Sequence, residues 1–323
     1  MLPFDLPVPV ALARPIEQLP DSAGLDLVQG KVDGWRALVR TGPEARVWSR
    51  HGTDLTRAFS DVASAAALLP PAVLDGELIA VTPDGNLSFA LLQTRSGKGP
   101  RPGAGFAVQV AAFDLLALDD VDTRPLPYEE RNRRLVKLLA AGPPQIRPLP
   151  VTDDLAEART WVGRLNGGVE GLLLKPAASR YVGGGYGSGW RKWRERHPVD
   201  AVVVGIVPAA NPRQQAAVLA QPDARGRLRA VGVSLPLSDV LRAELAPLLR
   251  PIGDDLAELP GVVGGLPGSP AVRYLPVEPT IVVEMLVDQA RPEFGRYRHR
   301  SRVVRRRPDL TPDQIRPATP SRR

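Results

Sequence analysis

Short apolar segments rich in Val, Leu and Ile recur along the first two-thirds of the chain, separated by turn residues such as Pro83-Asp84-Gly85. Segments of this length, bounded by Gly, Pro and Asp, are typical of β-strands. We therefore expect strands at residues 25–28, 35–39, 73–81, 106–116 and 169–174.

Three longer segments, 56–69, 128–141 and 153–165, carry apolar residues at helical spacing. The last begins beside Asp153 and Asp154, which suit the N-terminus of a helix. Helices and strands alternate irregularly, without a βαβ rhythm or an internal repeat. This order favours an α+β fold with antiparallel sheets over a doubly wound parallel sheet.

The pattern changes after Trp193, where strands are expected at 200–207, 226–233, 272–275 and 280–287, with one helix at 237–249. A region of this size and strand content suits a small β-barrel such as the oligonucleotide-binding (OB) fold. We expect three parts in the chain, namely an α+β domain over 1–195, an OB-fold domain over 196–310 and a flexible tail over 311–323.

The composition narrows the class of protein. With 323 residues and 43% hydrophobic content, the chain can bury two cores. No apolar stretch approaches the ~20 residues that cross a bilayer, and the N-terminus lacks the basic start of a secretory signal, so we expect a cytoplasmic protein. Because the chain has no cysteine and only three scattered histidines, thiolate metal sites, zinc sites and serine–histidine catalysis are disfavoured. The chemistry is left to Lys, Arg, Asp and Glu.

The net charge of +7 is concentrated at one end. From Arg291 onward there are eleven arginines against three acidic residues, a net +8, so residues 1–290 carry about −1. Clustered arginines suit a phosphate backbone, because each neutralised phosphate releases condensed counterions. The alternative, a solvated tail, applies best from Thr311 onward.

Lysine is rare in this chain. Of the 42 basic residues five are lysines, namely Lys31, Lys98, Lys137, Lys175 and Lys192. Arginine stays protonated in proteins, whereas a lysine amine with an ordinary pKa of ~10.4 can lose its proton and attack an electrophile. A lysine kept in an arginine-dominated chain is therefore a candidate nucleophile.

Lys31 lies in Gly30-Lys31-Val32-Asp33-Gly34-Trp35-Arg36, between two expected strands. A turn at Asp33-Gly34 would hold the amine at the mouth of a pocket. Taken alone, the segment could equally be a charged hairpin turn.

Five further elements follow Lys31 in order, and together they give the chain a resemblance to the covalent nucleotidyltransferase superfamily of DNA ligases, RNA ligases and messenger-RNA capping enzymes. The nucleophile motif Lys-x-Asp-Gly-x-Arg matches residues 31–36. The other five elements that resemble family motifs are Ser49-Arg50-His51-Gly52, Asp75-Gly76-Glu77, the strand around Phe113, Glu170-Gly171 to Lys175, and Lys192-Trp193-Arg194.

The resemblance implies a role for each matching residue. Lys31 would attack the α-phosphate of ATP and form a covalent Lys–AMP, with Mg²⁺ or Mn²⁺ held near Glu170 and Asp33. The nucleotide would be bound by Gln29 at the base, Phe113 stacked on adenine, Glu77 at the ribose, and Arg36, Arg50, Lys175 and Lys192 at the phosphates.

Three positions depart from the family pattern. Gln29 stands where many ligases have Glu, which leaves the choice between ATP and GTP open, although its carbonyl can accept from the adenine amino group. Arg194 replaces the second Lys of Lys-x-Lys, preserving charge but not geometry. In the C-terminal motif, Leu310 follows Asp309 where the family often has Lys, and an arginine such as Arg307 would orient pyrophosphate.

The resemblance implies an ATP-dependent DNA ligase of the minimal bacterial repair or end-joining type. Its nucleotidyltransferase (adenylation) domain would precede an OB-fold domain, and residues 291–307 would contact the duplex. We expect a monomer that acts on nicked duplex DNA at the nucleoid, with repair or end-joining proteins as partners. An RNA ligase, a capping-type guanylyltransferase and a non-enzymatic nucleic-acid binding protein are the alternatives.

Overall fold

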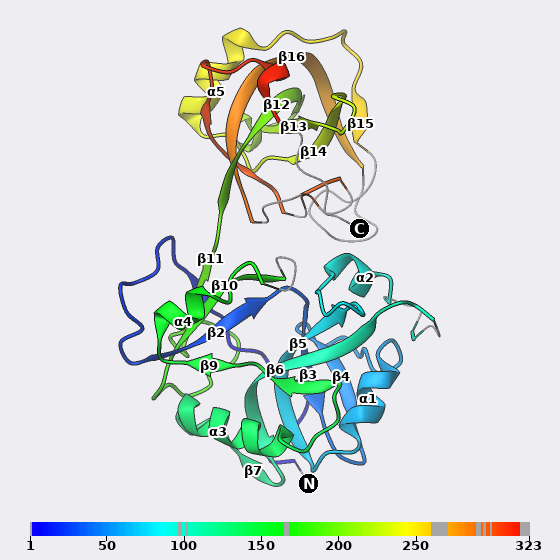
Figure 1. The fold of residues 1–323 in the computed structure, drawn as a ribbon, viewed down its shortest axis with the longest axis vertical. Helices are drawn as coiled ribbons and strands as arrows, with labels where there is room; N and C mark the ends of the chain where they lie inside the picture. Colours follow the sequence, from blue (N-terminus) through cyan, green and yellow to red (C-terminus); the bar gives the residue numbers. More distant parts are fainter. Residues whose placement is uncertain are drawn as a thin grey trace. The chain divides into compact units, whose positions relative to one another are not determined.

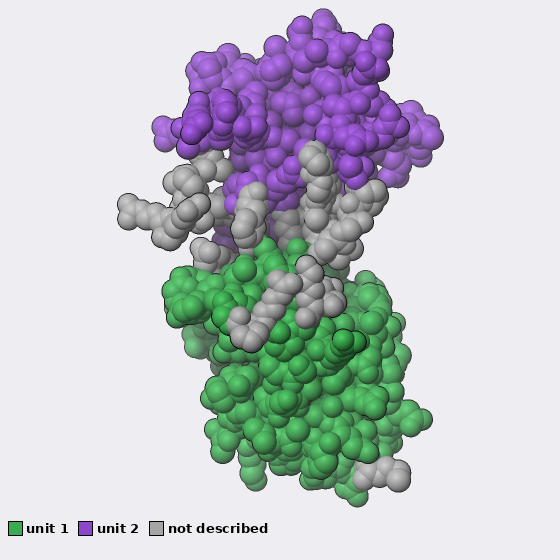
Figure 2. Space-filling model, turned by 90° about the vertical axis from the view of Figure 1, so that its right-hand side faces the viewer, with its two compact units in different colours: residues 1–194 green, residues 195–323 purple. Residues whose placement is uncertain are grey.

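The computed structural model describes residues 2–95, 99–100, 103–164, 168–259, 271–288, 292, 295–297 and 299–316. The chain divides into two compact units, residues 1–194 and 195–323, coloured separately in Figure 2. No helix among the described residues is both long and apolar enough to cross a membrane. Lys98, Arg291 and residues 317–323 of the predicted tail lie outside the described residues.

Unit 1 contains two sheets (Figure 1). The first sheet has the strand order β1 (Arg14–Pro15), β11 (Arg191–Arg194), β10 (Val169–Pro176), β2 (Asp26–Val32) and β9 (Val151–Thr152). The second has the order β4 (Arg46–Ser49), β3 (Trp35–Arg40), β5 (Ala72–Val81), β6 (Ala107–Leu118) and β7 (Val121–Asp122), with β8 (Ile146–Pro148) beside β6. Two pairings, β1 with β11 and β6 with β8, are parallel, and the other pairings of the named strands are antiparallel.

The helices of unit 1 are α1 (Ser60–Ala66), α2 (Phe89–Gln93), α3 (Tyr128–Leu139) and α4 (Leu155–Arg159). Helix α3 buries Tyr128, Arg131, Leu135 and Leu139, a spacing of three or four residues that lines one helical face. The expected segments 56–69 and 153–165 form shorter helices than their patterns suggested. The N-cap of α4 is Asp154, whose side chain accepts a hydrogen bond from the Ala156 backbone N–H.

The segment that carries Lys31 crosses from one sheet to the other. Strand β2 pairs with β10 and β9, whereas β3 pairs with β4 and β5, so the chain does not turn back as a hairpin at Asp33-Gly34. A Cβ atom on Gly34 would run into the carbonyl oxygen of Leu78 on β5. Only glycine fits at this close approach, which holds the segment between β2 and β3 against the second sheet.

Unit 2 is built on one sheet (Figure 1). Its strand order is β14 (Leu228–Val233), β13 (Ala216–Pro222), β12 (His197–Val207), β16 (Val272–Val287) and β15 (Ala257–Leu259), with β17 (Arg302–Arg306) beside β16. Helix α5 (Asp239–Leu245) and the following 3₁₀ turn Ala246–Leu248 occupy the expected helical segment. The side chains of Leu241 and Leu245 pack into the core that the sheet encloses.

Strand β16 is longer than its sequence suggested, because the two expected strands 272–275 and 280–287 are one. Against β12, Gly205 faces Pro276 while Val203 faces Ile281, so residues 277–280 bulge out of the pairing. Proline cannot donate to a ladder, and a bulge is where a sheet tolerates it. Pro279 lies inside this bulge and Pro276 at its edge.

Ile315 extends the core of unit 2. It is buried against Val202 and Val282, after the 3₁₀ turn Pro312–Gln314. Burial of an isoleucine side chain stabilises the folded state by about 1.5–3 kcal/mol. The first residues of the segment expected to be a tail are thereby attached to the sheet.

The glycine in Glu170-Gly171 gives a direct test of the first sheet. A Cβ atom on Gly171 would meet the carbonyl oxygen of Trp193 on the neighbouring strand β11. We expect Gly171→Ala to lower the free energy of unfolding by about 1–3 kcal/mol or more, the cost of forcing strands apart. Chemical denaturation measures it, with Gly185→Ala as the control because nothing lies within 4 Å of the added carbon there. Equal stability of the two variants would contradict this packing.

Candidate active site

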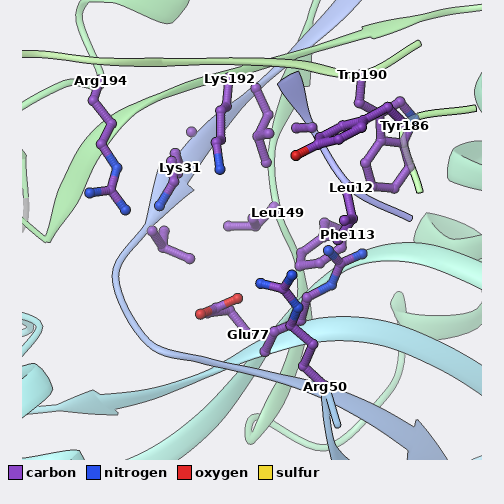
Figure 3. Close-up of a pocket in the computed structure, with 15 residues that line it drawn as sticks. Leu12, Lys31, Arg50, Glu77, Phe113, Leu149, Tyr186, Trp190, Lys192 and Arg194 are labelled. Carbon is purple, nitrogen blue, oxygen red and sulfur yellow. The ribbon is translucent and has the colours of Figure 1, made fainter. Parts of the chain in front are cut away.

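A cavity of about 250 Å³ is lined by both sheets of unit 1 (Figure 3). Strands β2, β10 and β11 contribute from the first sheet, and β3, β5 and β6 from the second. Six of the residues singled out in the sequence line this cavity: Lys31, Arg36, Arg50, Glu77, Phe113 and Lys192. Residues far apart in the chain thus meet at one site.

Lys31 reaches the cavity from β2 and forms an ion pair with the carboxylate of Glu170 on β10. The side chain of Glu170 is almost fully buried, and its Oε1 atom also lies 3.1 Å from a guanidinium nitrogen of Arg194. One carboxylate therefore holds two cations. Figure 3 shows Lys31, Lys192 and Arg194 reaching the cavity from one side and Glu77 and Arg50 from the other.

Positive charge dominates the cavity. The pKa of Lys192 is lowered by partial burial first and then by the charges of Lys31, Arg194 and Arg50. Cations that are placed so close destabilise one another unless an anion joins them. The arrangement therefore suits a ligand with several negative charges, such as a nucleoside triphosphate.

Arg36 is fixed by its neighbours. Its Nε and one terminal nitrogen donate to the two carboxylate oxygens of Asp75, at 3.0 and 2.6 Å, and the other donates to the Ala11 carbonyl at 2.6 Å. Asp75 also accepts from the Tyr181 hydroxyl at 2.7 Å. Burial alone would lower the pKa of Arg36, but Asp75 outweighs it and raises the pKa. A fork-to-fork pair of this kind fixes the guanidinium in one orientation.

Glu77 is the carboxylate on the cavity lining, on β5. Burial raises its pKa to about 8, although the nearby charges of Lys31 and Arg36 oppose the shift. At neutral pH its carboxyl group is therefore largely protonated before any ligand enters. A carboxyl group in this state can both donate hydrogen bonds to sugar hydroxyls and accept hydrogen bonds from them.

Aromatic rings form another part of the lining. Phe113 and Trp190 are only 5% and 2% exposed to solvent, and both line the cavity. The exposed ring of Tyr186 also lines it. Trp190 packs edge-on against Tyr181. Flat apolar rings beside a cation-lined cavity suit a base attached to phosphates.

The other four residues singled out in the sequence do not line the cavity. Gln29 is fully buried, and among the described residues neither atom of its amide has a hydrogen-bond partner. Asp33 is buried and donates its backbone N–H to Gly168 at 2.9 Å. Glu170 lies behind Lys31, and Lys175 is fully buried beside Phe113.

Metal ligands are few in the part of the chain that the structure describes, where no group of three or more His, Cys, Asp or Glu side chains could hold an ion. Mg²⁺ commonly binds through one or two carboxylates together with substrate phosphates and waters. Glu170, beside Lys31, fits that donor set. A metal would therefore depend on the bound nucleotide for most of its ligands.

The sequence reasoning missed several residues of the site. Asp75 and Tyr181 fix Arg36, while Trp190 and Tyr186 line the cavity. Asp75 carried a signal, since a carboxylate inside an otherwise apolar strand needs a buried cation as partner. Tyr186 carried none, because its place depends on a glycine-rich loop whose path the sequence does not specify.

Arg307, assigned to pyrophosphate by resemblance, belongs to unit 2. There it pairs with Asp200 at 2.9 Å and with Asp309 at 2.7 Å. Its neighbours Arg305 and Arg306 pair with Glu284 and Glu244. Much of the positive charge in this segment is thus balanced by carboxylates within unit 2.

A lysine amine at a cation-lined cavity with an aromatic wall has the features that a nucleotide-binding site with a nucleophile requires. Comparison with known proteins agrees, since the sequence model of the ATP dependent DNA ligase domain matches residues 11–194. The chain belongs to this family of ATP-dependent DNA ligases.

Relatives with curated names cover almost the whole chain. DNA ligase C of Mycobacterium tuberculosis is 30% identical over 345 residues, covering 96% of this chain and 93% of that protein. DNA ligase C2 of Mycolicibacterium smegmatis is 29% identical over 335 residues, covering 95% and 92%. A solved structure from a study of Lig E DNA ligases has a TM-score of 0.59 at 16% identity, covering 93% and 99% of the two chains, and shares the fold.

The pair of Arg36 and Asp75 yields a prediction on stability. Asp75 is fully buried, and its loss would leave a largely buried guanidinium without a counter-charge. We expect Asp75→Asn to lower the free energy of unfolding by about 3 kcal/mol, because the charged partner stays buried without a counter-charge. The more exposed pair of Asp122 and Arg124, with side chains 31% and 30% exposed, is the matched control, and Asp122→Asn should cost about 1 kcal/mol or less. Equal losses in chemical denaturation would refute the anchoring role of Asp75.

The raised pKa of Glu77 yields a prediction on pH. Between its ordinary value of 4.5 and about 8, the folded chain binds this proton and the unfolded chain does not, so the contribution of Glu77 to stability falls as pH rises through this window. Glu77→Gln mimics the protonated form at every pH. We therefore expect the stability of Glu77→Gln relative to the natural chain to increase from pH 5 to pH 8 in denaturation curves. A difference that stays constant with pH would contradict the shift.

Proposed function

We propose that this chain seals nicks in duplex DNA by way of a covalent Lys31–AMP. The observation that carries the proposal is the place of the Lys31 amine, on the lining of a cavity where Arg50, Lys192 and Arg194 supply positive charge. Such cations stabilise the charge that develops when an amine attacks a phosphate. The membership of the ligase family agrees with this chemistry.

The first step forms a bond between the Nζ atom of Lys31 and the α-phosphorus of ATP and breaks the bond to pyrophosphate. The amine must be neutral when it attacks, and Glu170, which accepts a hydrogen bond from it, is the nearest group to receive the proton. Arg50, Lys192 and Arg194 would hold the phosphates. A divalent cation near Glu170 and Asp33 would neutralise phosphate charge when bound.

The aromatic and polar residues would bind the nucleoside. Phe113 would stack on the adenine, and Glu77 would bond the ribose. The buried amide of Gln29, on the same strand as Lys31, offers an acceptor for the adenine amino group. Guanine has a carbonyl oxygen at that position, so recognition by the Gln29 carbonyl favours ATP over GTP.

The later steps would pass AMP from Lys31 to the 5′-phosphate of a nick, and the 3′-hydroxyl would then displace AMP. We propose that unit 1 is the adenylation domain and that unit 2 is an OB-fold domain, supported by its curved six-stranded sheet (Figure 1). Exposed arginines such as Arg300 and Arg302 are the residues of the basic segment best placed to meet phosphates.

The test uses α-labelled ATP and α-labelled GTP with Mg²⁺, followed by denaturation of the protein. We expect label from ATP on the natural chain, none on Lys31→Ala, and at least about 10²-fold slower labelling of Lys192→Ala, because fixed cations stabilise the developing charge. Lys137→Ala, on the exposed face of α3, is the control and should label normally.

Substrate and base choice follow from the same preparation. Nicked DNA should be sealed faster than nicked RNA, and label should come from ATP rather than GTP. Label from GTP alone would favour a capping-type guanylyltransferase, and the absence of both labels would leave a nucleic-acid binding protein. Either result would overturn the proposed function.

A further inference from the structure

Lys175 occupies an unusual place. Its side chain is fully buried and does not line the cavity, although it lies beside two residues that do. Its Nζ atom donates a hydrogen bond to the backbone carbonyl of Phe113 at 2.9 Å. The cavity and Lys175 thus contact the same residue, Phe113, from different sides.

Three aromatic rings surround the amine. Nζ of Lys175 lies 4.2 Å from the ring centre of Trp190, 4.4 Å from that of Tyr128 and 4.7 Å from that of Phe113. A cation at such distances is attracted by the negative faces of the rings, most strongly where water is excluded. The rings of Phe113 and Trp190, which line the cavity, are therefore both in contact with the Lys175 amine.

An ion pair does not account for this lysine. The nearest carboxylate oxygen, on Asp114, is 4.0 Å away, and Asp114 already forms a fully buried bidentate pair with Arg131 at 2.7 and 2.9 Å. Burial lowers the pKa of Lys175 to about 7, against the pull of Asp114 and Asp75 and with the support of Arg131 and Arg36. Keeping an amine here is costly, which calls for a role beyond packing.

We propose that Lys175 is a positioning residue for the rings of Phe113 and Trp190, which form the wall that binds the base. Lys175 would then affect ATP binding through the base and not through the phosphates. The inference rests on the proposed function, in which Phe113 stacks on adenine. The hydrogen bond to the Phe113 carbonyl fixes the backbone of β6, and the three ring contacts fix the planes of the side chains. Rings held in advance lose less conformational freedom when the base binds.

A direct phosphate contact, the role implied by resemblance, leads to a different result. A residue that contacts the β- and γ-phosphates affects every reaction in which pyrophosphate enters the site. A residue that positions the base affects ATP binding and leaves pyrophosphate binding unchanged. The forward and reverse directions of Lys31 adenylation separate the two roles.

The experiment measures Lys175→Met in both directions, namely the KM for ATP in formation of Lys31–AMP and the KM for pyrophosphate in its reversal. We expect the KM for ATP to rise about tenfold, within the range of base–aromatic stacking, while the rate at saturating ATP and the KM for pyrophosphate stay within about twofold. A parallel rise in both KM values would show a phosphate contact and overturn the proposal. Unchanged values in both directions would also overturn it.

Two further variants sharpen the test. In Phe113→Leu, the added change Lys175→Met should raise the KM for ATP by less than about twofold, because residues that act through one another are not additive. Lys175→Gln keeps a donor for the Phe113 carbonyl and should restore part of the affinity lost in Lys175→Met. Full additivity with Phe113→Leu would contradict action through the ring.

Stability provides the remaining control. Replacing a buried ammonium by an apolar side chain of similar size removes a desolvation cost, so Lys175→Met should fold. If neither Lys175→Met nor Lys175→Gln folded, Lys175 would be a structural residue of the core, and the proposal would be wrong. If the natural chain and Lys137→Met took no label from ATP, the proposed function itself would fail. If both were labelled and Lys175→Met left the KM for ATP unchanged, only this inference would fail.

Discussion

The crossing of the chain from β2 to β3 is the constraint on which the site depends. Gly34 passes so close to β5 that no side chain fits there, and this contact fixes the first sheet against the second. Lys31 consequently belongs to one sheet and Arg36 to the other. The cavity is the space that the two sheets share, so its geometry follows from the register of both.

Charge explains how this space is used. The cavity lining carries the cations Lys31, Arg50, Lys192 and Arg194, while the nearby carboxylates are paired with cations or changed by burial. Glu170 forms an ion pair with Lys31, Asp75 forms one with Arg36, and burial raises the pKa of Glu77. An empty site of this kind is electrostatically unfavourable, and a polyphosphate relieves it.

Much of the site could be predicted from the sequence, because short motifs reflect local chemistry. Six predicted residues line one cavity, although they lie between residues 31 and 192. What could not be predicted depends on pairing between distant strands. Arg36 reaches Asp75 diagonally only because the register of β3 and β5 places Arg36 opposite Glu77, two residues along β5 from Asp75. Lys175 lies against Phe113 because β10 continues past the cavity. Neither of these two contacts can be predicted from the spacing of residues along the chain.

The fold shows the same division. Strands and helices with clear periodicity, such as α3, lie where the pattern predicted them. Two separate strands were expected at 272–275 and 280–287, but β16 runs through both, because residues 277–280 bulge out of its pairing with β12. The most direct measurement of the central claim is peptide mapping by mass spectrometry after incubation with ATP and Mg²⁺. The account predicts AMP attached to Lys31 and to no other residue; AMP on Lys175 or Lys192, or on none, would contradict it.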